Sequence, residues 1–394
     1  MASSTGAPIS AGAAAEEEEA VASAVTVTAN PHADLAEIMP SLPTAPGFPP
    51  YRMRRYGGFW HIDMYLKFIC ASHACFRPRP TDVLLASFPK TGTTWLKALA
   101  FSALNRAAHP PSPAGADHPL HRNSPHDLVR FLELADQDGD GLIYEEVPSP
   151  RLLATHVPYS LLPHSITGTD DGSGGRIMYV CRDPKDTFVS FWHYHEKTTA
   201  TLQQMADVGG ASEAMPTFEE AFELFCQGQS AEGPQWRHTL EYWEASCRSP
   251  DKVLFLRYED LLLDPPGSLR KIAAFMACPF SPEEEAAGVV RDIVELCSLG
   301  TLKGLEVNRR GSTMLGLKND AFFRNGTGGG LEQLHDAGHG GPAGRHRRRG
   351  ARGVHAHLWR FLQGFSLAYP TCMLKFIYVF SFSCDCNISR LKRD

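Results

Sequence analysis

The chain has 394 residues, of which 43% are hydrophobic and 21% charged, and its 38 Lys and Arg residues against 44 Asp and Glu give a formal net charge of −6. This composition is typical of a globular protein with a sizeable core, and it argues against a protein held to nucleic acid by a basic surface. The charge is uneven, because residues 1–50 contain six acidic residues and no Lys or Arg, whereas residues 328–394 contain ten Lys and Arg and four acidic residues.

The N-terminal segment, residues 1–48, predicts a disordered acidic arm because it is rich in Ala, Ser, Thr and Pro and contains the run Glu16–Glu19. It has neither the apolar core of a secretory signal nor the arginines of a transit peptide, so we expect a cytoplasmic protein. The ten cysteines lack paired or zinc-type spacing, which predicts neither a disulfide framework nor a metal site. Residues 136–141 resemble the start of a calcium loop, but Val147 stands where such a loop has Glu, which favours a surface turn.

The first candidate site follows a short apolar run, Val83–Phe88, that is typical of a buried parallel strand. The loop residues Pro89–Thr94 come next, and Trp95–Leu104 has helical composition. Backbone N–H groups at such a helix start attract a phosphate, and Lys90, Gly92 and two threonines add charge, close approach and hydroxyl donors. The order differs from a Walker A loop, and an ordinary turn between strand and helix is the alternative.

A second candidate site follows a second predicted strand, Arg176–Cys181. Arg182 comes at the carboxyl end of this strand, where ligands bind in open α/β sheets, and it suits a second phosphate. Ser190 lies eight residues on, so we expect it to reach the same place only if the first residues form a loop. Pairing of Arg182 with Asp183 or Asp186 at a helix start explains the pattern equally well.

Two phosphate sites on neighbouring units suggest a nucleotide with phosphates at both ends of its ribose. Between the two units lies a short predicted strand, Leu152–Ala154, and His156 follows it at the same edge. A lone histidine is usually structural, but this placement makes His156 the natural candidate for a general base.

These motifs resemble the soluble sulfotransferases of plants, in particular flavonol-sulfotransferase-like proteins. The resemblance runs from about residue 51 to about residue 326, and its motifs occur in the family's order: Tyr51–Trp60, Ser87–Lys97, Pro150–His156, Tyr179–Ser190, Leu256–Asp260 and Phe322–Gly326. It implies an α/β fold, a three-layer single domain with a central parallel sheet and a P-loop-like loop, over residues 49–327.

The resemblance also implies a reaction, in which the sulfonate of 3′-phosphoadenylyl sulfate (PAPS) passes to a hydroxyl of a small acceptor, with no metal. His156 would be the general base and Lys90 would stabilise the leaving oxygen. The remaining implied donor contacts, from the 5′-phosphosulfate through adenine to the 3′-phosphate, are Lys90, Thr91, Gly92, Thr93, Thr94, Trp95, Arg182, Ser190, Tyr258, Ser298, Arg324, Asn325 and Gly326.

The acceptor is not specified by the sequence. Five aromatic residues indicate a flat or hydrophobic phenol or alcohol such as a flavonoid or steroid, although packing in the core explains them equally well: Tyr56, Phe59, Trp60, Trp192 and Tyr194. No nucleic acid or membrane partner is expected, and the oligomeric state is not predicted.

The sequence departs from the family after Gly326, where Gly-Asp-Trp and a helix starting Thr-Pro are missing. Allowed codons for Gly330–Gly338, read one base later, encode Asp-Trp-Ser-Asn-Tyr-Met-Thr-Pro. We therefore interpret residues 328–394 as an out-of-frame tail, a hypothesis that transcript sequencing across Thr327 tests. A catalytically impaired protein that still binds PAPS or its product is the alternative function, because the missing motif covers the donor in the family.

Overall fold

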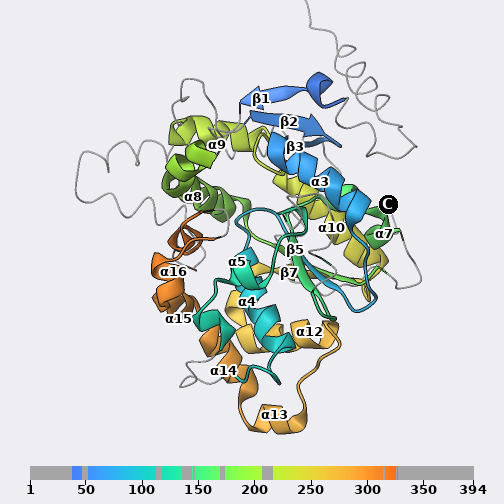
Figure 1. Ribbon diagram of the computed structural model, residues 1–394, viewed down its shortest axis with the longest axis vertical. Coiled ribbons are helices and arrows are strands. Elements are labelled where there is room, and N and C mark those ends of the chain that lie inside the picture. Colours follow the sequence, from blue (N-terminus) through green and yellow to red (C-terminus); the bar gives the residue numbers. More distant parts are fainter. Residues whose placement is uncertain are drawn as a thin grey trace, which may run out of the picture.

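The structure is a computed structural model that describes residues 38–46, 52–111, 118–134, 144, 147–168, 174–205, 216–313, 316–324 and 326 (Figure 1). Residues 1–37 and 47–48 of the predicted N-terminal arm, the predicted C-terminal tail 328–394 and the calcium-loop-like residues 136–141 lie outside this part of the chain. Residues 38–46 of that arm are described, and they include a short helix, Met39–Ser41, and a strand, Thr44–Pro46. The described elements in chain order are η1 Met39–Ser41, β1 Thr44–Pro46, β2 Arg52–Tyr56, β3 Phe59–Ile62, α3 Asp63–Cys75, β4 Val83–Ser87, α4 Thr93–Leu104, η2 Pro119–His121, α5 Pro125–Leu128, η3 Leu132–Leu134, β5 Leu152–Thr155, η4 Tyr159–Leu161, α7 His164–Thr167, β6 Arg176–Cys181, α8 Pro184–Met205, α9 Phe218–Cys226, α10 Gln235–Arg248, β7 Val253–Arg257, α11 Tyr258–Leu263, α12 Pro265–Phe275, α13 Pro282–Ala286, α14 Val289–Leu296, α15 Leu299–Gly304, α16 Glu306–Arg310 and η5 Asn319–Phe322.

A parallel sheet with strand order β5-β4-β6-β7 forms the centre of the molecule. Its register pairs Leu85 of β4 with Ala154 on one side and Met178 on the other. All three strands predicted from apolar runs are present, and β7 is a further strand that the apolar pattern did not single out. The carboxyl ends of parallel strands meet at one edge, so the segments that follow β4, β5 and β6 come together there.

Both faces of this sheet are buried, because successive strand residues point to opposite sides. Val83 and Leu85 pack with α4, α12 and α14, whereas Leu84 and Ala86 pack with α3 and α10 on the other face. The chain therefore forms helix, sheet and helix layers, which confirms the predicted three-layer α/β fold (Figure 1).

A second, antiparallel sheet, β1-β2-β3, was not predicted. It is attached to the loop before α10 through a ladder in which Trp60 N–H donates to Gly233 O and Glu232 N–H donates to Trp60 O. The buried side chains of His61 and Glu232 lie 2.8 Å apart beside this ladder. The sheet thus brings β3 and the start of α3 next to a loop from the far half of the chain.

A buried ion pair holds the opposite, amino-terminal edge of the central sheet. Arg151, fully buried before β5, donates two hydrogen bonds to Asp82 before β4, at 2.9 and 2.6 Å. The same guanidinium donates to the carbonyl oxygens of Tyr144 and Arg77 at 3.0 and 2.6 Å. This pair therefore ties together the residues that lead into two neighbouring strands, far from the carboxyl edge.

Two further properties concern the described part of the chain. None of its helices is long and apolar enough to cross a membrane. Within the same residues, no three His, Cys, Asp or Glu side chains gather closely enough to hold a metal ion.

Candidate functional site

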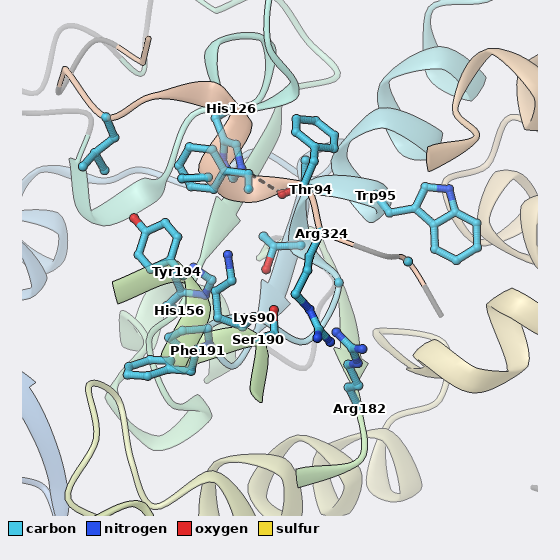
Figure 2. Close-up of a pocket in the computed structure, with 18 of the residues that line it drawn as sticks. Lys90, Thr94, Trp95, His126, His156, Arg182, Ser190, Phe191, Tyr194 and Arg324 are labelled. Atoms are coloured by element: carbon cyan, nitrogen blue, oxygen red, sulfur yellow. Dashed lines mark hydrogen bonds between the residues drawn. The ribbon is translucent and has the colours of Figure 1, made fainter. Parts of the chain in front are cut away.

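A cavity of about 690 Å³ opens at the carboxyl edge of the central sheet (Figure 2). The loop before α4, His156 after β5, Arg182 after β6 and residues of α8 line it, together with Arg324 near the end of the described chain. The strand-end placement predicted from the sequence therefore brings the candidate residues of all three segments into one cavity.

The loop before α4 is shaped by a backbone conformation that favours glycine. Gly92 has φ +118°, and a Cβ atom there would lie 2.7 Å from Cδ2 of Tyr258. The loop is tied to the sheet from below, because the hydroxyl of Thr91 lies 2.8 Å from Phe88 O and 3.0 Å from Val180 O. Thr91 consequently holds the loop and does not line the cavity, whereas Gly92, Thr93 and Thr94 do.

Lys90 carries the charge of this loop into the cavity. Its Nζ atom lies 4.1 Å from the ring centroid of Tyr194 and 5.4 Å from that of Phe322. Burial, together with the positive charges of Arg182, Lys197 and Arg324, lowers the pKa of Lys90 to about 7. The ammonium form is therefore poised to gain from a bound anion.

A second group of cations lines the same cavity, where Arg182 and Arg324 extend toward each other (Figure 2). Burial and the nearby charge of Arg182 lower the pKa of Arg324. The Arg182 guanidinium lies 3.8 Å from the carboxylate of Asp186 and 4.6 Å from the ring centroid of Tyr258. The ion pair considered from the sequence is therefore present, and Arg182 lines the cavity as well.

Ser190 reaches the cavity by a different route from the one expected. Helix α8 begins at Pro184, directly after Asp183, so no extended loop precedes Ser190. Ser190, Tyr194 and Lys197 are spaced four and three residues apart, which places them along one face of the helix, and all three line the cavity. Ser190 therefore reaches the cavity from a helix that runs along it, and not by way of the loop that we expected after Arg182.

Trp95 and Tyr258 form an aromatic corner at the side of the cavity. Their rings meet edge to face with centroids 5.7 Å apart. The indole N–H of Trp95 is buried and has no hydrogen-bond partner among the described residues. A buried donor of this kind at the side of the cavity can recognise an acceptor atom of a planar ligand.

His156 presents a nitrogen lone pair to the cavity. Its Nδ1 atom lies 2.7 Å from Ser87 O, and because a carbonyl oxygen can only accept, Nδ1 carries the proton. Burial lowers the pKa of His156 to about 3, so the ring is neutral and Nε2 keeps its lone pair. This is the form that a general base requires.

The backbone of His156 is fixed on both sides. Its N–H donates to Oε1 of Glu133 at 2.7 Å, and its carbonyl oxygen lies 2.9 Å from Nε2 of His238. Burial raises the pKa of Glu133 to about 7 even though the hydrogen bond from His156 favours the carboxylate. The Phe131 ring packs against the imidazole at a centroid distance of 4.7 Å.

Three of the predicted acceptor residues are not among the residues that line this cavity: Tyr56, Phe59 and Trp60. Phe59 is fully buried against His238, with ring centroids 6.3 Å apart, and Trp60 pairs with Gly233. Phe59 points at the protein interior, whereas Trp60, the next residue of β3, points to the opposite face of the strand and is only partly buried. Trp192 packs against Phe218 and does not line the cavity either, whereas Tyr194 does.

Of the predicted donor-binding residues toward the C-terminus, the structure describes some and not others. Ser298 and Gly326 line the cavity, and the Ser298 hydroxyl also caps α15 by accepting from Thr301 N–H at 3.1 Å. Gly326 has φ +64° and lies against Leu299, whose Cδ2 atom an added Cβ would meet. Asn325 lies outside the described residues.

Several cavity residues were not predicted from the sequence: Ile62, Tyr65, His126, Phe131, Glu133, Phe191, His195 and Ala231. Of these residues, His126 could most readily have been found from the sequence, because Ser124, Pro125 and Asp127 around it form the pattern of a capped helix start. The apolar members carry no motif, and only the fold brings them to the cavity.

Comparison with known proteins agrees with this geometry. The family model described as "Sulfotransferase domain" matches residues 80–333. Cytosolic sulfotransferase 5 of Arabidopsis thaliana is 38% identical over 296 residues, covering 73% of this chain and 85% of the relative. Cytosolic sulfotransferase 12 of the same plant is 40% identical over 293 residues, covering 74% and 84%.

Solved structures give the same result. A putative steroid sulphotransferase of Arabidopsis thaliana matches with a TM-score of 0.56 and 37% identity, over 69% of this chain and 88% of that one. A mouse sulfotransferase complexed with PAP, at 22% identity and a TM-score of 0.54 over 84% and 99% of the two chains, shares the fold.

The fold is that of a sulfotransferase, a class that transfers sulfonyl groups to small acceptors. The chain belongs to the plant cytosolic sulfotransferase family. The relatives' names state no acceptor, so the flavonol-specific resemblance remains a prediction.

Proposed function

We propose that this protein transfers the sulfonate group of PAPS to a hydroxyl of a small hydroxylated acceptor, with His156 as the general base. The observation that carries the proposal is the arrangement of the cavity. A neutral imidazole with its Nε2 lone pair, the Lys90 amine and two arginines line the same enclosed space.

The donor fits this arrangement because it is a polyanion with phosphates at both ends of a ribose. We assign the 5′-phosphosulfate to Lys90 and the backbone and hydroxyl donors that open α4, and the 3′-phosphate to Arg182, Ser190 and Arg324. Trp95 and Tyr258 would border the adenine. Structures of sulfotransferase-fold proteins with PAP, the donor without its sulfonate, support this assignment.

The reaction is an in-line displacement at sulfur. The acceptor oxygen forms a bond to sulfur while the bond from sulfur to the 5′-phosphate oxygen breaks, and the electron pair leaves with PAP. Nε2 of His156 takes the proton of the acceptor hydroxyl. Lys90 stabilises the charge that develops on the departing oxygen, so the products are a sulfate ester, PAP and a protonated base.

We assign the acceptor to the apolar side of the cavity, next to His156. Ile62, Tyr65, Phe131, Phe191 and Ala231 line the cavity and have no charge to offer. A flat, largely hydrophobic phenol or alcohol suits such a wall, as with flavonoids and steroids. A retinol dehydratase of the same fold has been solved with androsterone and PAP, which supports a pocket of this kind. A cytosolic location accords with the names of the relatives.

An acceptor panel with labelled PAPS tests the proposal. We expect PAP to bind, labelled sulfonate to appear on at least one phenolic or steroidal hydroxyl, and ATP with Mg²⁺ to leave thermal stability unchanged. The panel is run on this chain and on the chain read in the shifted frame after Thr327. The proposal fails if neither chain binds PAP or transfers sulfonate.

The second candidate is a protein that binds PAPS or PAP but has lost transfer. The observation that favours it is the Gly- and Arg-rich sequence after Gly326, where the family has its donor-covering motif. PAP binding by both chains, with turnover only in the shifted-frame chain, would establish this alternative.

Donor binding should depend on pH through Lys90. Because burial and neighbouring cations lower the pKa of Lys90 to about 7, the free amine loses its proton above that pH, whereas a bound anion favours the ammonium. PAP affinity is therefore expected to fall by up to about tenfold per pH unit above pH ~7. Calorimetric titrations with PAP above about pH 7 measure the slope, since the second ionisation of a phosphate, with a pKa of about 6, is nearly complete there.

Two variants of the same residue provide the control. Lys90→Met and Lys90→Arg should both abolish this slope, with weak binding throughout in the first and stronger binding in the second. A slope that persists in Lys90→Met would show that another group titrates.

A further inference from the structure

Lys97 is an unusual side chain for the interior of α4. It is fully buried, although burial of an amine without partners is costly and a leucine or methionine would fill the same space. Its Nζ atom lies 3.4 Å from the centroid of the Phe131 ring and 3.3 Å from Nδ1 of His126. The amine is thus directed at one ring nitrogen of a histidine from another element.

His126 connects this buried amine to the cavity. Its other ring nitrogen, Nε2, lies 2.9 Å from Oγ1 of Thr94 in the phosphate loop (Figure 2, dashed line). The ring is held between aromatic neighbours, with centroids 5.9 Å from Phe131 and 4.2 Å from Phe322. Lys97, His126 and Thr94 therefore form a continuous chain from the core to a residue that lines the cavity.

The chemistry of the three groups sets the direction of the hydrogen bonds. Burial lowers the pKa of Lys97 well below its usual value, whereas the charges of Glu133 and Asp127 favour its ammonium form. An ammonium has no lone pair and only donates, so in this form Lys97 donates to Nδ1 of His126. Burial, with the nearby charge of Lys97, lowers the pKa of His126 well below its usual value, so the ring carries one proton. That proton is on Nε2, which donates to Thr94 Oγ1, and the Thr94 hydroxyl hydrogen is left to point elsewhere.

We propose that Lys97 and His126 are positioning residues that turn the Thr94 hydroxyl outward as a donor to the phosphosulfate of PAPS. The inference rests on the proposed function, because it needs an anion at the phosphate loop. A hydroxyl group can rotate, so without a neighbour Thr94 Oγ1 could turn either its hydrogen or a lone pair toward the anion. The N–H of His126 occupies a lone pair of Thr94 Oγ1, which leaves the hydroxyl hydrogen to face the anion.

Two substitutions of His126 separate positioning from packing. Gln can place its amide N–H near the former Nε2, whereas Asn is shorter and imitates Nδ1, which faces Lys97. We expect His126→Asn to weaken PAP binding and raise the KM for PAPS by about tenfold, the effect of losing one hydrogen bond to a charged group. His126→Gln should bind PAP as the natural protein does. Equal losses in both variants, or a greater loss in His126→Gln, would overturn the proposal.

A double-mutant cycle tests whether the chain acts through Thr94. Lys97→Met and Thr94→Val should each weaken PAP binding, and together they should weaken it no more than Thr94→Val alone. Additive losses would show that Lys97 acts elsewhere, and a Lys97→Met chain that binds PAP normally would equally refute the role. Melting temperatures identify variants that are merely unfolded, in which case the His126 pair decides. If the natural chain binds no PAP, the proposed function fails too; if it binds and these patterns are absent, only the positioning role fails.

Discussion

Replacing His156 with alanine is expected to lower kcat for sulfonate transfer by about 10²–10⁴-fold, the usual contribution of a general base. The Nε2 lone pair is the acceptor for the hydroxyl proton in the proposed reaction, and the variant removes it. PAP affinity should be preserved, because the proposed phosphate contacts come from the loop before α4 and from Arg182 and Arg324. Steady-state kinetics with a productive acceptor and calorimetry with PAP measure the two quantities.

The pH profile gives a second readout of the same residue. Burial lowers the pKa of His156 to about 3, below its usual 6.5, so the neutral base is present at every pH above that value. Protonation of His156 should therefore produce no loss of kcat/KM near pH 6.5.

A histidine outside the cavity serves as the control. His121, in the short helix η2, is not among the residues that line the cavity, so His121→Ala should keep its activity. A His156→Ala variant that turned over like the natural protein would remove His156 from the mechanism. Loss of both transfer and PAP binding would instead indicate a structural role.

Arg151→Met is expected to lower the free energy of unfolding by about 3–5 kcal/mol, the effect of breaking a buried ion pair from one side. Arg151 donates two hydrogen bonds to Asp82. Without them the buried carboxylate keeps the N–H of Arg79, at 2.7 Å, but loses its countercharge. Denaturant unfolding followed by fluorescence or circular dichroism measures the difference.

An exposed ion pair provides a matched control for the same substitution. Arg310 and Glu306 lie 2.8 Å apart on α16, with side chains 74% and 71% exposed. Arg310→Met should change stability by less than about 1 kcal/mol, because surface pairs contribute little. Similar losses in the two variants would mean that burial does not determine the strength of the Arg151 pair. Since this pair lies at the edge opposite the cavity, folded Arg151→Met protein should still bind PAP.

The sequence was sufficient to predict the donor side of the site because its residues follow buried strands directly. Lys90, His156 and Arg182 each come just after a predicted strand, and parallel strands bring such positions to one edge. An apolar run followed by a loop and a helix is a local feature of the sequence, so the position of each residue at a strand end could be predicted from its neighbours in the chain.

The acceptor side could not be predicted in this way, since it depends on contacts between distant segments. Tyr65 and Ala231 line the same cavity although 166 positions separate them. The β2–β3 hairpin that helps to bring them together contains most of the motif Tyr51–Trp60, but that motif did not predict a hairpin. Aromatic residues of that hairpin looked like pocket residues, but the alternation of β3 buries Phe59 instead. The sequence likewise did not predict that Ser190 reaches the cavity from helix α8, because that depends on the direction in which the helix runs past the cavity.

The cluster of Lys90, Arg182 and Arg324 has a consequence for the lifetime of the protein. Burial and, to a smaller extent, the mutual repulsion of these cations lower the pKa values of Lys90 and Arg324, and both effects oppose the folded state whenever no anion is bound. A polyanion that neutralises the cluster relieves this repulsion and, by mass action, depletes the unfolded population. The amount of intact protein in a cell would then follow the concentration of the nucleotide, so that supply of donor would govern turnover of the enzyme as well as its rate.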